Sequence, residues 1–274
     1  MYISIDYASI FIIYSRIFKY SCVVKNIVLK GGNAVRYFGG KQRISKPLSK
    51  FLNEQLKDGQ PFVDLFCGSC NVIANIDGDR LKIANDKHKY LIAMWIELQK
   101  GWIPPQNLTL EEYQYIKANK DEKPHLTGFV GFGCSFAGKW FGGYARTSVG
   151  RNENFCLSSH RSSISKINKM SDVSFNNDDY SNVNIPIGSL VYCDIPYKNT
   201  TTYCKNEVGE FDHDCFYQWV RDNSHKYDIY ISEYKYNVPN DFEIVWEYKS
   251  KKEIRNKDNE RETTVEVLMR YNGK

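Results

Sequence analysis

A short apolar strand that runs into a glycine turn stands early in the sequence, as Phe62-Val63-Asp64-Leu65-Phe66-Cys67-Gly68-Ser69. Such a turn lets a ligand approach the backbone at a helix N-terminus, at the edge where open α/β sheets bind nucleotides. We expect that helix to start near Asn71. A second strand, Leu81–Ala84, ends at Asn85-Asp86, and a helix follows from Tyr90 to Gln99.

The alternation of strands and helices is interrupted once, between about residues 102 and 170. This stretch carries Pro104-Pro105, helix signals and a run of glycines and aromatics. Because strands that alternate with helices predict a mostly parallel sheet, the interrupted stretch predicts an inserted domain. The last two strands can pair as a hairpin. The further elements expected are helices at Ile44–Leu56, Leu110–Ala118, Ser159–Met170 and one ending at His225, and strands at Val173–Phe175, Leu190–Cys193, Ile229–Ile231, Glu243–Glu247 and Val265–Met269.

The composition is that of an ordinary soluble globular protein, with 274 residues of which 42% are hydrophobic and 25% charged. A net charge of +5 permits a polyanionic partner without requiring one. Residues 1–30 differ from the rest, and we interpret them as an N-terminal extension. Their apolar stretch Ile10–Tyr14 is broken by Arg16 and Lys19, well short of a membrane span, and no small-residue cleavage site follows. We therefore expect neither a membrane segment nor a signal peptide.

The eight cysteines are scattered and form no small-domain disulfide framework. A chain of this length does not need disulfides, so we expect reduced thiols and a cytoplasmic protein. Cys67 and Cys70 have C-x-x-C spacing, which raises zinc or redox chemistry. Because no second pair and no His pair at ligand spacing accompanies them, we interpret them as small buried thiols and expect no metal.

The position of Asp86 indicates the kind of cofactor. A carboxylate at the end of the second strand can accept both ribose hydroxyls of an adenosine cofactor. The turn after Asp64 lacks the three glycines of a dinucleotide fingerprint, and the sequence has no G-K-[ST] phosphate loop. A ligand without a pyrophosphate therefore fits better than NAD or ATP. S-adenosylmethionine carries adenosine and no phosphate.

Two further segments can contact such a ligand. The loop Tyr37–Lys41 has two glycines that permit close backbone approach, and Lys41 can meet a carboxylate. A plain loop is the alternative. Asp179-Tyr180, after the third strand, is placed to accept the adenine amino group, with Asp178 as its rival and solvated loop acids as the alternative for both.

The tetrapeptide Asp194-Ile195-Pro196-Tyr197 ends a strand that is expected to be buried. It places a carboxylate, two backbone carbonyls and an aromatic face on one short turn, which can hold a planar base by its exocyclic amine. An aromatic amine is a poor nucleophile until its protons are accepted. Alone the tetrapeptide is weak evidence, because such sequences often just end a strand in a turn.

The order of these motifs resembles the Dam-type (α-group) DNA adenine-N6 methyltransferases, whose target-recognition domain is inserted before their D-P-P-Y motif. The resemblance covers about residues 35–271 and includes Ser232-Glu233-Tyr234 and the loop Lys198–Thr201. It implies a Rossmann-like class I methyltransferase fold, with a mostly parallel sheet, a C-terminal antiparallel hairpin and a small inserted recognition domain. The expected parts are an extension at 1–30, a catalytic domain at 31–101 and 171–274, and the inserted domain at 102–170.

The resemblance also implies roles for individual residues. The turn would receive a flipped adenine, with Asp194 and the carbonyl of Ile195 accepting from its 6-amino group, Pro196 shaping the turn, and Tyr197 stacking on the base. Catalysis would then be positioning plus hydrogen bonding, without a metal. The residues implied to bind S-adenosylmethionine are Tyr37, Phe38, Gly39, Lys41, Asp64, Phe66, Gly68, Asp86, Asp179 and Tyr180.

Two residues depart from the family pattern. The first proline of D-P-P-Y is Ile195 here, which keeps the carbonyl but loses one φ restraint. A weakened or catalytically silent DNA-binding relative is therefore an alternative. The usual second glycine of the first motif is Cys70, for which we expect an ordinary backbone conformation at the start of the helix.

The run Phe136–Arg146 in the insertion mixes basic residues, aromatics and glycines. These can contact phosphates and wedge between bases, and a hydrophobic loop is the alternative. The basic runs within 249–257 either touch the DNA backbone or form a solvated turn. We interpret residues 211–225, including His213, as scaffold. The residues expected to contact DNA are Lys139, Trp140, Tyr144, Arg146 and Lys198.

The sequence thus predicts a site-specific adenine-N6 methyltransferase of double-stranded DNA that uses S-adenosylmethionine. Cytosine-N4 methylation is the nearest alternative chemistry, and the motif order favours adenine. Methylation of RNA or a small molecule is a third alternative, disfavoured by the aromatic and basic insertion. A cognate restriction endonuclease is a candidate partner, and we expect a monomer or weak dimer.

Overall fold

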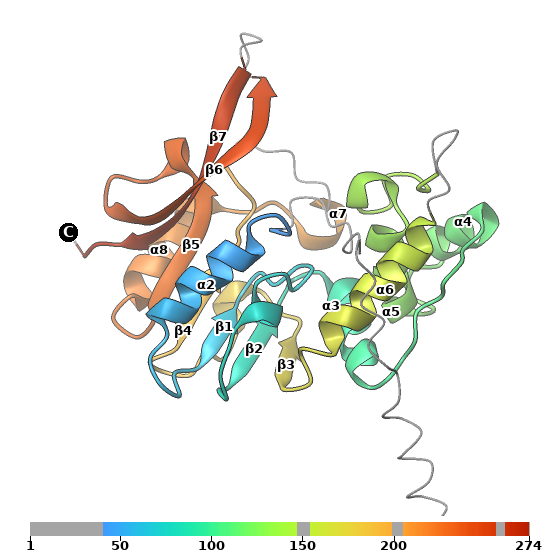
Figure 1. Ribbon diagram of the computed structural model, residues 1–274, viewed down its shortest axis with the longest axis horizontal. Coiled ribbons are helices and arrows are strands. Elements are labelled where there is room, and N and C mark those ends of the chain that lie inside the picture. The colour runs from blue at the N-terminus through green and yellow to red at the C-terminus, as the bar shows by residue number, and fades with distance from the viewer. Residues whose placement is uncertain (1–40, 147–153, 199–204, 256–260, 274) are drawn as a thin grey trace, which may run out of the picture. The chain divides into compact units, whose positions relative to one another are not determined.

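The computed structural model describes residues 41–146, 154–198, 205–255 and 261–273 (Figure 1). The extension predicted at residues 1–30 and the loop residues Tyr37, Phe38 and Gly39 lie outside the described residues. In the part of the chain that is described, no helix is both long and apolar enough to cross a membrane.

A mixed sheet forms the centre of the described fold, with its strands in the order β3-β2-β1-β4-β5-β7-β6. The first five of these positions are joined by parallel pairs, and β7 pairs antiparallel with both β5 and β6. The predicted mostly parallel sheet and terminal hairpin are therefore confirmed. The strands are β1 Phe62–Asp64, β2 Lys82–Asn85, β3 Val173–Asn176, β4 Leu190–Cys193, β5 Asp228–Tyr234, β6 Phe242–Arg255 and β7 Arg261–Tyr271.

Each predicted helix is formed except the one between β1 and β2, although the helix predicted at Ser159–Met170 runs from Phe155 to Ile167 and two short α-helices were not predicted. The α-helices are α2 Ser45–Gln55, α3 Lys89–Gln99, α4 Leu110–Ala118, α5 Pro124–Gly128, α6 Phe155–Ile167, α7 Lys205–Val208 and α8 His213–Asn223. Shorter helical turns are η1 Ile73–Asn75, η2 Phe129–Gly133, η3 Phe136–Gly138, η4 Tyr180–Asn182 and η5 Lys235–Asn237.

The helix predicted to start near Asn71 is not formed, and that prediction was wrong. Gly68 and Cys70 both have positive φ, at 47° and 55°, so the chain turns twice before any helix can begin. A single 3₁₀ turn, η1, then follows, and Gly78 with φ 86° redirects the chain toward β2. The connection is a compact loop rather than a helix.

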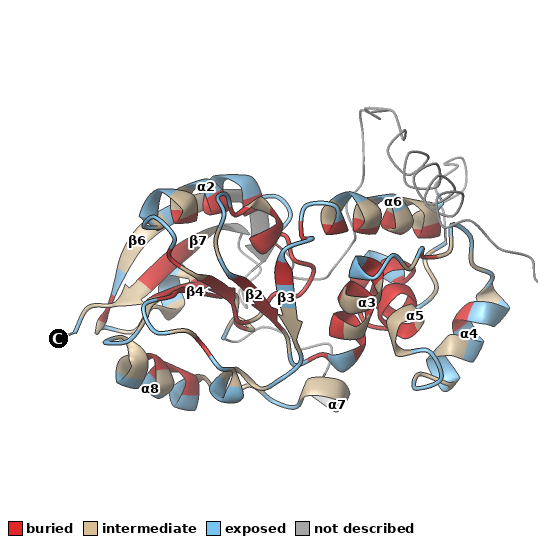
Figure 2. Ribbon diagram, turned by 90° about the horizontal axis from the view of Figure 1, so that it is seen from below, coloured by how far each residue is buried: buried red, intermediate tan, exposed pale blue. Residues whose placement is uncertain are grey.

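The sheet has a separate hydrophobic core on each face because successive strand residues point to opposite sides. Figure 2 shows α2 and α8 on opposite sides of the sheet. Toward α2, Phe62 and Leu190 pack with the helix residue Leu48 in one buried cluster. Toward α8, Val63 and Val191 pack with Phe216 in the other. The two layers of helices therefore hold the strand ends in fixed positions.

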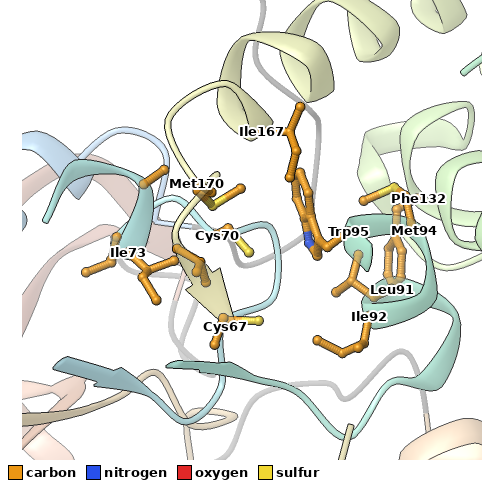
Figure 3. Close-up of a cluster of buried hydrophobic side chains, with 14 of the residues drawn as sticks. Cys67, Cys70, Ile73, Leu91, Ile92, Met94, Trp95, Phe132, Ile167 and Met170 are labelled. Atoms are coloured by element: carbon orange, nitrogen blue, oxygen red, sulfur yellow. The ribbon is translucent and has the colours of Figure 1, made fainter. Parts of the chain in front are cut away.

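Helix α3 joins the sheet to the stretch between residues 102 and 170. Its Trp95 is fully buried, donates from Nε1 to the carbonyl of Gly68 at 3.0 Å, and lies beside Ile167 of α6 (Figure 3). Phe129 and Phe132, from the turn after α5, belong to the same buried cluster as α3. The glycine-turn loop is thus braced by the helix that carries the stretch 102–170.

Helix α5 approaches α3 so closely that it leaves no room for a side chain at Gly128. A Cβ there would lie 2.0 Å from the carbonyl oxygen of Tyr90 and 3.2 Å from Cβ of Met94. A backbone carbonyl inside a helix cannot move aside cheaply. This contact therefore fixes how α5 packs on α3.

The substitution Gly128→Ala should lower the free energy of unfolding by about 1–3 kcal/mol, the usual cost of overpacking. In an uncrowded helix the same change stabilises by about 0.5–1 kcal/mol. A decrease in the free energy of unfolding would therefore by itself indicate the close contact. Urea unfolding measures it, with Gln114→Ala on the exposed face of α4 as a control expected to be neutral. A Gly128→Ala protein as stable as wild type would contradict this packing.

Candidate active site

The acidic residues singled out in the sequence meet where the direction of strand addition reverses. β1 lies between β2 and β4, so the chain builds outward on one side through β2 and β3 and on the other through β4 and β5. Asp64 is the last residue of β1 and Asp194 directly follows β4. Ligands of open α/β sheets bind at this switch point, outside the carboxyl ends of the strands.

The carboxylates at this edge raise one another's pKa values. Burial raises the pKa of Asp64 well above its usual range, and the charges of Asp194 and Asp86 raise it further. Burial likewise raises the pKa of Asp86 to about 6 and also raises that of Asp194. Oδ1 of Asp64 is buried and has no hydrogen-bond partner among the described residues. The edge therefore favours a ligand that brings positive charge or hydrogen-bond donors.

Asp86 holds the glycine turn in place through its side chain. Its Oδ2 accepts from the backbone N–H of Gly68 at 2.9 Å and its Oδ1 from that of His88 at 2.8 Å. A carboxylate has further lone pairs, so Asp86 can still accept from a ligand hydroxyl. Asp64, Gly68 and Asp86, three of the residues implied to bind the cofactor, are thus brought together.

Cys70 does not have the backbone conformation that the sequence predicted. Its φ is 55°, in the left-handed region that favours glycine, so the expectation of an ordinary conformation was wrong. The buried thiol packs in the cluster around Trp95 (Figure 3). A left-handed non-glycine residue costs about 1–2 kcal/mol, and the burial of this side chain offsets that cost.

Lys41 contacts the turn at Asp194–Tyr197 rather than a separate ligand site. Its Nζ donates to Oδ1 of Asp194 at 2.5 Å and also donates to the hydroxyl of Tyr197. The lysine side chain is only 5% exposed. Glu266 of β7 lies 3.6 Å from Nζ and accepts from the Tyr197 hydroxyl at 3.2 Å. Lys41 does meet a carboxylate, and that carboxylate belongs to the protein.

Ile195 is held by packing where the family pattern has a proline. Its side chain is 2% exposed and belongs to the buried cluster under α8, with Val191 and Phe216. The lost φ restraint is thus accompanied by an anchored side chain. The carbonyl of the next residue, Pro196, is bound by Nε2 of His213 at 2.7 Å.

Two residues that support this turn were missed as functional residues in the sequence. The sequence pattern marks His213 only as scaffold, and Glu266 lies in no motif. Both reach the turn through long-range packing, from the start of α8 and from β7, so no local motif marks them. Glu233, near the end of β5, accepts from the backbone N–H of Lys198 at 3.1 Å and also positions the end of the turn.

Aromatic residues line the same edge next to the third strand. The rings of Phe66 and Tyr180 lie 5.8 Å apart and both contact Phe211. Asp179 accepts from Lys87 Nζ at 2.9 Å and caps the turn that carries Tyr180 through Ser181. The structure therefore brings Phe66 and Tyr180 together and places Asp179 beside them in an ion pair.

The residues expected to contact DNA differ in how far they are buried. Trp140 is 8% exposed and packs on the rings of His88, Tyr90 and Phe132, so it is not available to wedge between bases in this arrangement. The Tyr144 hydroxyl donates to the carbonyl of Leu108 at 2.6 Å. The remaining three residues are partly or fully at the surface: Lys139 is half-buried, and Arg146 and Lys198 are exposed.

Residues 37–127 match the family model described as D12 class N6 adenine-specific DNA methyltransferase. The match contains Lys41, the turn after Asp64, and Asp86. This part of the chain is similar to that family. The resemblance inferred from the ordered motifs is therefore confirmed over residues 37–127 for the adenine methyltransferases. The turn Asp194–Tyr197 lies beyond the matched residues. A search of curated proteins found no match.

The methyltransferase shows no group of three or more His, Cys, Asp or Glu side chains that could hold a metal ion, within the residues that the structure describes. Cys67 and Cys70 are both buried free thiols. Burial raises the pKa of the Cys67 thiol well above its usual range, so this thiol is protonated at neutral pH.

His88 gives the methyltransferase a measurable pH dependence of stability. Burial lowers the pKa of His88 from 6.5 to about 4, and neither ring nitrogen has a hydrogen-bond partner among the described residues. The folded protein therefore keeps this ring neutral while the unfolded chain protonates it below about pH 6.5. The contribution of His88 to the free energy of unfolding is therefore fully present above about pH 6.5, and it is lost as the pH falls toward 4.

Lowering the pH from 7 to 4 should thus reduce the free energy of unfolding by about 2–3 kcal/mol through His88 alone. The carboxylates with raised pKa values act in the opposite direction, so the measured quantity is the difference between wild type and His88→Phe at each pH. The variant keeps the backbone N–H that binds Asp86. Equal pH slopes for the two proteins would contradict a buried neutral His88.

Proposed function

We propose that this methyltransferase transfers a methyl group from S-adenosylmethionine to the 6-amino group of a flipped adenine at specific sites in double-stranded DNA. The observation that carries the proposal is the convergence of Asp64, Asp86 and the turn Asp194–Tyr197 at one sheet edge. These acceptors would serve the cofactor and, next to it, an exocyclic amine. A Rossmann-like class I methyltransferase fold agrees with the strand order.

The described residues fit S-adenosylmethionine. Its ammonium and sulfonium are positive, which suits an edge where carboxylates raise one another's pKa values and where Oδ1 of Asp64 has no partner. Asp86 would accept from the ribose hydroxyls, and Phe66 and Tyr180 would line the adenine side with Asp179. When bound, the cofactor supplies the methyl group.

The turn would activate the target amine by hydrogen bonding alone. Asp194 would accept one hydrogen bond from the 6-amino group and the carbonyl of Ile195 the other, which concentrates electron density on the nitrogen. Tyr197 would stack on the flipped base, a contact worth roughly 1–3 kcal/mol. Because the turn is fixed by Lys41 and His213, its acceptors are oriented before the base arrives, and such preorganisation lowers the barrier.

We propose residues 102–170 as the part that recognises the DNA sequence, with Lys139 and Arg146 as contacts to phosphates. Lys198, directly after the turn, would contact the strand that carries the flipped base. Trp140 supports this stretch from inside instead of touching bases, because its ring is buried.

A catalytically silent relative is the second candidate, favoured by the replacement of a proline by Ile195. The buried Ile195 side chain and the bond from His213 to Pro196 argue that the turn keeps its shape. The two candidates differ in one result: a silent protein would bind cofactor and DNA without transferring a methyl group.

Incubation with methyl-labelled S-adenosylmethionine and unmethylated DNA should place label on 6-methyladenine. Asp194→Ala should reduce the rate at least about 100-fold, because an acceptor used in the transition state is lost. The matched control is Asp222→Ala, which removes an exposed carboxylate on α8 and should leave the rate unchanged. Label on 4-methylcytosine, or no label with both ligands bound, would contradict the proposal.

Cofactor affinity should weaken as the pH falls below about 6, the pKa of Asp86. Protonation removes an acceptor for the ribose hydroxyls, so S-adenosylmethionine should bind about tenfold more weakly at pH 5 than at pH 7. Calorimetric titration at both pH values measures this. Asp86→Asn should bind weakly at both and show a flatter pH dependence, whereas an unchanged pH dependence would exclude Asp86 as the group responsible.

A further inference from the structure

Glu266 lies next to the catalytic turn because of the register of the terminal hairpin. β7 runs antiparallel to β5 with Glu266 opposite Tyr234. The ring of Tyr234 packs edge-on against that of Tyr197, with 4.5 Å between ring centroids. A residue far from Asp194 in sequence is therefore delivered to the turn by strand pairing.

The contacts of Glu266 continue a chain of hydrogen bonds that begins at Lys41. The lysine ammonium donates to the Tyr197 hydroxyl, and that hydroxyl donates to Oε2 of Glu266 at 3.2 Å. Burial raises the pKa of Tyr197 well above its usual range, so the phenol keeps the proton that it donates. Oε2 also lies 3.6 Å from the lysine nitrogen. The carboxylate of Glu266 thus contacts both the Tyr197 hydroxyl and Lys41, the residue that binds Asp194.

The negative charge of Glu266 repels the nearby carboxylate of Asp194, a cost that a neutral acceptor would avoid. The glutamate side chain is 22% exposed and that of Asp194 is 20% exposed, and both carboxylates flank the single ammonium of Lys41. Asp64, Asp86 and Tyr192 also face Asp194 and add no positive charge. A neutral amide could accept from the Tyr197 hydroxyl equally well. The charge of Glu266 therefore acts on Lys41.

Of the two carboxylate oxygens of Asp194, Lys41 binds Oδ1. An incoming amine can therefore reach the second oxygen without displacing the lysine. Access to the second oxygen requires the Lys41 ammonium to stay beside Oδ1. We infer that Glu266 is a positioning residue for methyl transfer, which holds Lys41 and the Tyr197 hydroxyl so that one oxygen of Asp194 remains open to the adenine amine. The inference rests on the proposed function of the turn.

The test is Glu266→Gln in the full chain, assayed for methyl transfer to DNA over a range of pH. We expect kcat/KM to fall by about 10- to 100-fold, as for the loss of a charge-assisted contact. The acid limb of the pH profile should also move to lower pH, because the glutamate charge raises the pKa of Asp194 and the glutamine does not. A merely structural role would lower the rate without moving this limb.

Three variants keep the test specific. Glu247→Gln removes a carboxylate of the neighbouring strand that pairs with Lys235 at 2.6 Å, and it should leave rate and profile unchanged. Tyr197→Phe keeps the ring and cuts the link through the hydroxyl, and it should reproduce part of the loss. Adding Glu266→Gln to Lys41→Met should lower kcat/KM no further, because the ammonium to be held is absent.

The outcomes separate this inference from the proposed function. A wild-type protein without methyl transfer would overturn the function itself. An active wild type whose Glu266→Gln variant keeps its rate, or loses rate with an unmoved acid limb, would overturn the positioning role alone. If Glu266→Gln unfolds, Glu266→Asp supplies the comparison. It keeps the charge on a shorter side chain, so it should lose rate while its acid limb stays close to that of wild type.

Discussion

The parallel pairing of β1 with both β2 and β4 is the constraint on which the site depends. It places Asp64 and Asp194 at one sheet edge and brings Asp86 beside them through β2. Burying several carboxylates close together is unfavourable, and the raised pKa values of Asp64 and Asp86 reflect this. The two hydrophobic cores, one under α2 and one under α8, supply the packing that holds the strands together against it.

The turn Asp194–Tyr197 is supported from three directions, which explains how it can lack the usual proline. Lys41 reaches it from before α2, His213 from α8, and Glu266 from β7. The Ile195 side chain is buried beneath it. A turn whose polar atoms are bound on several sides keeps its geometry without a ring to restrain φ. Preorganisation here comes from tertiary contacts more than from local backbone stiffness.

Much of the fold was predictable, because strand and helix periodicity is local and the strands alternate with helices. Leu110–Ala118 and Leu190–Cys193 were bounded as the structure has them. The features that the sequence could not predict depended on tertiary contacts. Trp140 lies in a basic and aromatic run but is buried against His88, and Cys70 takes a glycine conformation inside a packed core. Glu266 could not be found, because its place follows from the register between β5 and β7.

The most direct test of the account is a crystal structure of the methyltransferase with S-adenosylhomocysteine and a duplex containing its recognition adenine. The account predicts an unstacked adenine on the ring of Tyr197, with its 6-amino group hydrogen-bonded to Asp194 and to the carbonyl of Ile195. Lys41 should remain between Asp194 and Glu266. An adenine bound elsewhere, or one whose amine contacts neither acceptor, would contradict the central claim that this turn activates the base.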